Sequence, residues 1–319
     1  MYFPISGIEV FPAIPFLVAF VISFFTSMGG VSGAFLLLPF QVSFLGFTSP
    51  SVSPTNLVYN IIAIPSGVYR YIREGRMAWP LAWLIIAGTL PGVFTGAIVR
   101  ILYFPDPGMF KFFVGWVLLY IAVRLLYDLT PRAGRNAVRT RELEMKFNER
   151  SIRFRNQHDP EEIIQGVVRT VNFSLTNYTY KFYGEQFSFN TITLFGLSLI
   201  VGLIGGIYGI GGGAIIAPFL ITVFGLPVYT IAGATLLATF VTSIAGVIFY
   251  TGIAPIYGHT GLAIAPDWKL GILFGLGGFL GVYCGARLQK YFPAKLIKLI
   301  LGFVLLFLSA TYILNFFYT

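Results

Sequence analysis

The chain has 319 residues, of which 56% are hydrophobic and only 10% are charged, and its mean hydropathy is +0.81. A soluble domain needs a charged surface, so this composition excludes that class and predicts an all-α polytopic protein of the lipid bilayer. The alternation of a membrane β-barrel is absent. The net charge of +9 does not indicate nucleic-acid binding, because the basic residues cluster in a few loops, as is typical of cytoplasmic loops.

The N-terminal stretch is apolar and lacks a basic n-region, since the first Lys or Arg is Arg70. We therefore expect it to remain in the mature protein rather than to act as a signal peptide. The single cysteine, Cys284, lies in an apolar segment, so an intrachain disulfide is excluded.

Five apolar segments are expected in a first membrane repeat, residues 1–127, and five more in a second, residues 190–319. They run approximately over 11–27, 33–47, 54–71, 79–100 and 110–127, and then over 190–208, 213–226, 229–250, 268–289 and 296–317. The second segment of each half is short for a span. Together with the first, it forms either a pair of spans or a re-entrant hairpin bent at glycines.

Composition shifts sharply in the insert between the halves, residues 128–189, which holds ten of the 21 basic and eight of the 12 acidic residues. Arg141 to Arg155 is a candidate helix. Val167 to Phe189 alternates apolar and polar residues around Gly184-Glu185, a pattern that predicts a β-hairpin. Its charge places the insert in the cytoplasm, either as an ordered linker or as a regulatory or partner-binding module.

The two halves repeat the same pattern about 180 residues apart. Gly29 to Ala34 (GGVSGA) aligns with Gly209 to Ala214 (GIGGGA), and Gly88, Gly92 and Gly96 recur as Gly277, Gly281 and Gly285. Such duplication is common in secondary transporters. The glycines near the end of each half have the spacing of close helix packing.

Charge indicates that the repeats have inverted topology. The loop after the third segment holds Arg70, Arg73 and Arg76, whereas its counterpart at 251–266 has no Lys or Arg. The loop after the fourth segment is poorly charged in the first half but holds Arg287 and further lysines in the second. Equivalent loops therefore face opposite sides, and both termini are expected outside the cytoplasm.

The glycine clusters are the strongest candidates for a functional site. Four glycines in the five residues 209–213 weaken a helix, each by about 1 kcal/mol relative to alanine, so we expect the chain to break there. A helix that starts after a break points its free N–H groups and positive end at the gap, which makes an anion site without a buried lysine. We expect the repeat symmetry to bring the two breaks together near the midplane.

Polar residues in the third segment of each half occupy matching positions: Asn56 pairs with Thr235, and Asn60 with Thr239. Their amides and hydroxyls can donate hydrogen bonds to an oxyanion or between helices. Gln41 is a further candidate. The predicted substrate-binding residues are Gly30, Ser32, Gly33, Asn56, Asn60, Gly211, Gly212, Gly213, Thr235 and Thr239.

No Asp or Glu lies near the centre of an apolar segment, which argues against a carboxylate proton relay or a carboxylate cation site. Motifs of intramembrane hydrolases are also absent. The sequence therefore predicts a non-enzyme with no catalytic residues, no metal and no cofactor.

The paired glycine clusters, each followed by a proline, the inverted halves and the Asn/Thr positions resemble the TauE/SafE sulfite exporter family. The match is good for Gly209 to Gly213 with Pro218, whereas Val31 and Ser32 replace glycines in the first-half copy. The resemblance covers both membrane halves but not the insert. It implies transport of a sulfur-containing anion such as sulfite or an organosulfonate, with export the expected direction.

We therefore expect a secondary transporter of a small sulfur oxyanion in a prokaryotic cell membrane, working by alternating access around the two breaks. Two alternatives remain open. An anion channel would use the same site without alternating access, and a membrane sensor or scaffold would act through the insert. The oligomeric state is not indicated by the sequence.

Overall fold

The computed structural model describes residues 1–29, 32–73, 77–127, 129–130, 169–174, 176–182, 185–226, 228–288 and 294–318. The helices of the first half are α1 (Ala13–Gly29), α2 (Ala34–Ser43), α3 (Val52–Ala63), α4 (Pro65–Arg73), α5 (Trp79–Leu102) and α6 (Pro107–Tyr127). Those of the second half are α9 (Thr191–Tyr208), α10 (Gly212–Thr222), α11 (Val228–Ile253), α12 (Trp268–Leu288) and α13 (Ala294–Tyr318).

Each apolar segment predicted from the sequence forms helix, which confirms the all-α polytopic class. Six of the described helices are long and apolar enough to cross a membrane: α5, α6, α9, α11, α12 and α13. The third segment of the first half differs from expectation, because it divides into α3 and α4 before Pro65. A proline disfavours the helical conformation of the residue before it, whereas the equivalent α11 has no proline and continues for 26 residues.

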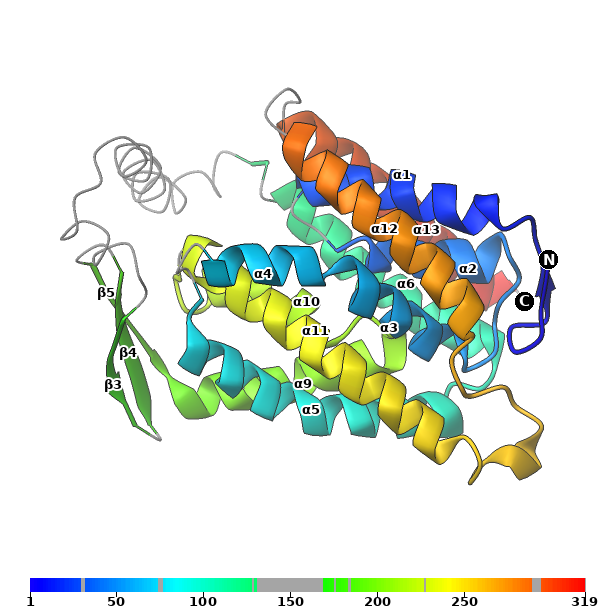
Figure 1. Ribbon diagram of the computed structural model, residues 1–319, viewed down its shortest axis with the longest axis horizontal. Coiled ribbons are helices and arrows are strands. Elements are labelled where there is room, and N and C mark those ends of the chain that lie inside the picture. Colours follow the sequence, from blue (N-terminus) through cyan, green and yellow to red (C-terminus); the bar gives the residue numbers. More distant parts are fainter. Residues whose placement is uncertain are drawn as a thin grey trace.

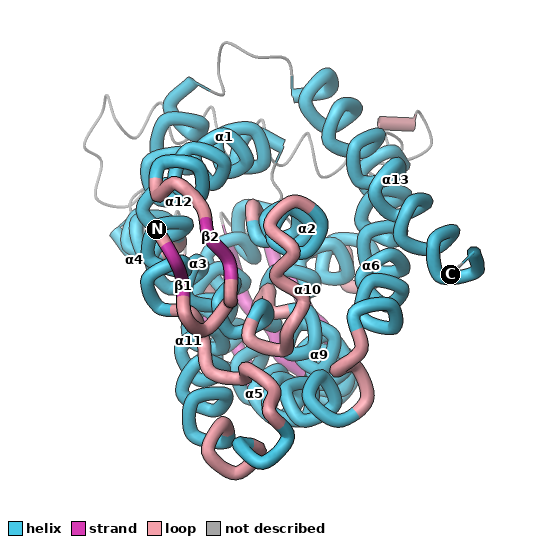
Figure 2. The backbone as a smooth tube through the Cα atoms, turned by 90° about the vertical axis from the view of Figure 1, so that its right-hand side faces the viewer, coloured by secondary structure: helices cyan, strands magenta, loops and turns pink. Residues whose placement is uncertain are grey.

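Helices α2 and α10 are half-helices of 10 and 11 residues. At 1.5 Å per residue they are roughly 15 Å long, about half of the hydrocarbon core. The first pair of segments in each half is a hairpin of a longer helix and a short one, and the length of the short helix favours the re-entrant alternative over a pair of spans. Figure 2 shows α2 and α10 at the centre of the molecule, with the longer helices around them.

The two hairpins open toward opposite ends of the molecule. In Figure 1, α1–α2 begins and ends at the end that carries both termini, whereas α9–α10 begins and ends at the opposite end, beside the β-sheet. This is the arrangement of inverted repeats. The C-terminal ends of α4 and α12, which the two loops predicted to be basic follow in sequence, lie toward the same end as the sheet (Figure 1).

The halves are joined by an exchange of helix partners: α5 packs along α9, and α1 packs along α12. Glycines make the close approach possible. A Cβ at Gly92 would meet the main chain of Leu199 and Leu203 on α9, and one at Gly281 would meet Phe20 on α1. The predicted role of these glycine ladders in helix packing is confirmed.

Two small sheets complete the fold. An N-terminal hairpin pairs β1 (Tyr2–Phe3) with β2 (Ile8–Glu9). The predicted hairpin at the end of the insert is instead a three-stranded antiparallel sheet of β3 (Arg169–Phe173), β4 (Asn177–Phe182) and β5 (Glu185–Asn190), because a third strand pairs with the free edge of β4. The candidate helix over 141–155 lies outside the described residues.

The sheet of the insert is attached to the second half. The hydroxyls of Tyr180 and Thr230, at the start of α11, lie 2.8 Å apart. The rings of Phe189 and Phe224 pack edge to face. Burial disfavours the phenolate and raises the pKa of Tyr180, so this contact keeps its proton.

Candidate functional site

The second glycine cluster breaks the chain as predicted. Helix α9 ends at Tyr208 and α10 begins at Gly212. Gly209 and Gly211 have φ of +84° and +76°, in the left-handed region that side chains with a Cβ rarely adopt. Glycine is therefore required at these two positions by backbone conformation alone.

Helices α3, α5 and α11 enclose this second break, and a Cβ at Gly209 would meet the main chain of Ser53 on α3. A Cβ at Gly211 would lie 2.9 Å from Oγ of Ser243 on α11. One at Gly212 would lie 2.5 Å from Cβ of Thr89 on α5, and one at Gly213 would lie 2.6 Å from Oγ1 of Thr239. In this conformation the break is tightly packed, with no space for a side chain.

The first break lies between α1 and α2, and Gly30 falls outside the described residues. Gly33 precedes α2 with helical backbone angles, φ −60° and ψ −26°. A Cβ there would collide with the hydroxyl of Tyr59 and would lie 3.0 Å from Oγ of Ser23. The first break is therefore bordered by hydroxyl groups of side chains.

Asn56 on α3 connects the two breaks. Its Nδ2 donates to the carbonyl of Ala34, the first residue of α2, at 3.2 Å, and to that of Gly209 at 3.0 Å. Gln41 Nε2 donates to its Oδ1 at 3.3 Å. The structure thus brings the two glycine clusters within the span of one side chain, and Asn56 is fully buried.

A proline creates a second connection between the breaks. Pro39 lacks an N–H and cannot bond to the carbonyl of Phe35, one turn earlier in α2. That carbonyl instead accepts a 2.8 Å hydrogen bond from the hydroxyl of Tyr208, the last residue of α9. Pro39 thereby leaves the carbonyl of Phe35 free to accept a hydrogen bond from a residue of the second half of the protein.

The other polar candidates lie around the second break. Asn60 Nδ2 donates to the carbonyl of Ile210 at 3.0 Å, while its Oδ1 has no partner. Thr235 and Thr239 on α11 are 6% and 2% exposed. Their hydroxyls donate to carbonyls of their own helix, those of Ala232 and Thr235. The side-chain donors are thus engaged in internal bonds in this conformation.

The N-termini of α2 and α10 supply the electrostatics of the site. Each short helix points its positive end at its own break, and the breaks adjoin. The Gly212 N–H donates to Thr242 Oγ1 at 3.1 Å, while helix geometry leaves those of Gly213 and Ala214 without a partner within the helix. The arrangement favours a small anion chemically, although the breaks are closed.

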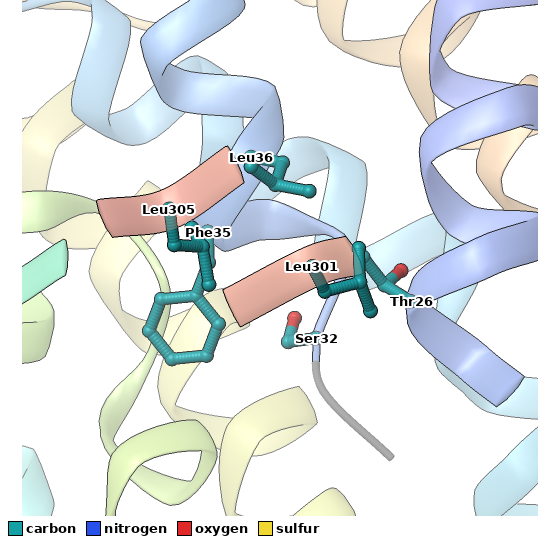
Figure 3. Close-up of a pocket in the computed structure, with 6 residues that line it drawn as sticks. All are labelled: Thr26, Ser32, Phe35, Leu36, Leu301 and Leu305. Atoms are coloured by element: carbon teal, nitrogen blue, oxygen red, sulfur yellow. The ribbon is translucent and has the colours of Figure 1, made fainter. Parts of the chain in front are cut away.

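Ser32 has a different neighbourhood from the other candidates. Its Oγ accepts from the N–H of Ala34 at 3.3 Å. Figure 3 shows it beside a small recess between α1, α2 and α13. Six residues line the recess: Thr26, Ser32, Phe35, Leu36, Leu301 and Leu305.

Sequence reasoning did not single out several polar neighbours of the breaks: Ser23, Ser53, Tyr59, Thr89, Thr242 and Ser243. Ser243 lies four residues after Thr239, so extending the helical period of Thr235 and Thr239 would have found it. Thr89 and Tyr59 carry no such signal, since only packing brings them to the glycines. No group of three potential metal ligands occurs among the described residues.

The chain was compared with known proteins. The model of the family described as sulfite exporter TauE/SafE matches residues 15–312. The chain is also similar to the probable membrane transporter protein YunE of Bacillus subtilis (strain 168), with 22% identity over 293 residues, which cover 89% of this chain and 90% of that protein. No solved structure matches it significantly. The chain belongs to the sulfite exporter TauE/SafE family and is an integral membrane transporter.

Proposed function

We propose that the protein is a secondary transporter that exports a small sulfur oxyanion, sulfite or an organosulfonate. The observation that carries the proposal is the meeting of two oppositely oriented half-helix breaks, which Asn56 joins through Ala34 and Gly209. The positive N-terminal ends of two helices meet at these buried breaks, and together they favour binding of an anion such as sulfite or an organosulfonate.

The substrate-binding groups in this proposal are main-chain N–H groups around Gly33 and Gly211 to Gly213, with Asn56, Asn60, Thr235 and Thr239 as side-chain donors. Asn56 and Asn60 now donate to carbonyls of the two breaks. When the halves rock apart, these bonds open and the amide groups become free for the anion. Export then follows alternating access to the breaks from the two ends of the molecule.

The end that carries the basic loops and the insert is assigned to the cytoplasm, because Lys and Arg are retained on that side. Both termini then lie outside the cytoplasm. The membrane in this proposal is the cell membrane of a prokaryote. The buried interior of the site holds no carboxylate among its described residues, so a coupled proton would travel on the substrate or through water.

The test is flux of sulfite and of short sulfonates in liposomes that contain purified protein. Wild type should give slow, saturable flux, and Gly212→Val should abolish it, because a side chain at 212 displaces Thr89 and fills the break. Gly196→Val is the matched control, since no atom lies within 4 Å of a Cβ at that position of α9. Normal flux in a well-folded Gly212→Val variant would refute the site.

Thermal stabilisation by sulfite, sulfate, thiosulfate, sulfoacetate and phosphate identifies the preferred anion. If the protein gave single-channel currents, it would be an anion channel rather than a transporter. Exchange of residues 131–168 for a flexible linker of equal length leaves the sheet of the insert in place. We expect this variant to keep most of its flux, whereas its inactivity would favour a sensor or scaffold.

A further inference from the structure

Arg100 is the unusual charged residue of this protein. It is the last residue of the predicted apolar segment 79–100, and the structure places it in the last turn of α5, with an exposed fraction of 0%. Among the Lys and Arg side chains whose burial is described, it alone is fully buried. A buried cation is costly unless an opposite charge or several hydrogen bonds compensate for it.

Main-chain carbonyls and an aromatic ring surround its guanidinium. Nη1 donates to the carbonyl of Phe104, and Nη2 donates to that of Thr48 at 3.2 Å. The Cζ atom lies 3.7 Å from the centre of the Phe110 ring. No ion pair with a carboxylate is found for it within the described ranges, and the nearby Asp106 caps α6 through the N–H of Met109. Among the residues that the structure describes, none therefore supplies a counter-charge to this guanidinium.

One edge of the guanidinium is incompletely used. The Nε atom is buried and has no hydrogen-bond partner. Nε and Nη2 form the side-on edge of the planar group, which matches two oxygens of an oxyanion. That edge now holds a single 3.2 Å bond, to the carbonyl of Thr48 in the loop between α2 and α3.

The last turn of α5 holds Arg100. This end of α5 lies at the end of the molecule that carries both termini and toward which the α1–α2 hairpin opens (Figure 1). Tyr250 on α11 belongs to the same buried cluster as Ile101, the residue after Arg100. The Tyr250 hydroxyl donates to the carbonyl of Gly206 at 3.0 Å, three residues before the second break. The buried region beside Arg100 therefore extends to the helix that ends at the second break.

We propose that Arg100 recognises the transported anion at this end of the pathway: when the loop carrying Thr48 moves away, Nε and Nη2 bind two oxygens of the anion. The inference rests on the proposed transport of an oxyanion, and it adds a second binding site for the anion besides the glycine breaks. It also gives a reason for an unpaired buried donor, which is unfavourable when left unused.

The test compares Arg100→Gln, which removes the charge, with Arg100→Lys, which keeps it but loses the side-on edge. In liposomes, Arg100→Gln should raise the half-saturation concentration for sulfite or methanesulfonate about tenfold or more, with a smaller rise for Arg100→Lys. Lys269→Gln, a change of an exposed cation at the start of α12, is the control and should leave it unchanged.

A purely structural role would lower the melting temperature of Arg100→Gln while its half-saturation concentration stayed at the wild-type value, and that result would overturn the inference. If the variants do not fold, modification of wild type by phenylglyoxal decides. We expect sulfite or methanesulfonate to protect Arg100 but not exposed Arg287, and unprotected Arg100 would refute the inference. Absence of saturable flux in wild type would instead refute the proposed transport function.

Discussion

The two glycine breaks occupy equivalent positions in the repeated sequence pattern, yet their structures differ. At the second break, Gly209 and Gly211 adopt left-handed backbone angles, and a Cβ at Gly209 would meet the main chain of Ser53. At the first break, Gly33 keeps helical angles and lies against the hydroxyls of Tyr59 and Ser23. The same local feature thus depends on backbone geometry in one half and on side-chain packing in the other.

This difference predicts different tolerance to substitution. A side chain can be shortened or can move aside, whereas main-chain atoms of a packed helix cannot. The second break should therefore be rigid and the first adjustable. In an alternating-access cycle, we expect the first hairpin to move more freely than the second.

The largest effect is expected for Gly209→Ala. The substitution forces a Cβ into left-handed geometry and against the main chain of Ser53, with a cost of about 2 kcal/mol or more. Flux should be lost and the melting temperature should fall in detergent. Shortening neighbouring side chains should give no rescue, so recovery in a Ser53→Gly background would contradict a backbone origin.

Asn56→Ala should have the next largest effect, because it removes the link between the breaks. Two carbonyls and the Gln41 amide lose a buried partner, at about 1–3 kcal/mol each when no water replaces it. Flux measured in liposomes should fall at least tenfold. Asn60→Ala is the comparison, and its smaller set of bonds should give a smaller loss; equal losses would mean that the link has no special role.

Gly33→Ala should reduce flux and lower the free energy of unfolding by about 1–3 kcal/mol, the range for overpacking. Because the collision is with the Tyr59 hydroxyl, the double variant with Tyr59→Phe should recover part of both. Tyr59→Phe alone is the control, since it loses the contact with Ser23. If neither flux nor stability recovered in the double variant, side-chain packing would not explain the first break, and the proposed difference between the two breaks would be wrong.

Thr235→Val is expected to have the smallest effect on stability. Its hydroxyl bonds to a carbonyl of its own helix, and such bonds contribute little to stability. If Thr235 turns to the anion during transport, the half-saturation concentration should rise several-fold with an unchanged melting temperature. Thr235→Ser keeps the hydroxyl and should resemble wild type. An unchanged half-saturation concentration in Thr235→Val would assign Thr235 to packing.

Features of the candidate site that depend on local sequence were predicted, whereas contacts that depend on packing were not. The break at 209–213 followed from helix propensity, and the meeting of the two clusters followed from the repeat. The hydroxyls of Thr89 and Tyr59 were missed, because they lie in otherwise apolar or aromatic segments and reach the glycines only through packing. The full burial of Arg100, at the end of the predicted segment 79–100, was not predicted, because burial depends on the elements that pack around it.

Hydrophobicity, the duplicated glycines and the charges of equivalent loops by themselves determined the membrane class, the ten apolar segments and the inverted repeat, because these depend on local composition and on periodicity along the chain. The pairing of α5 with α9 and α1 with α12, the division at Pro65 and the third strand of the insert were decided by tertiary structure. So was the burial of Arg100. Each depends on surfaces that meet only after folding, and packing, unlike periodicity, relates residues that are far apart in sequence.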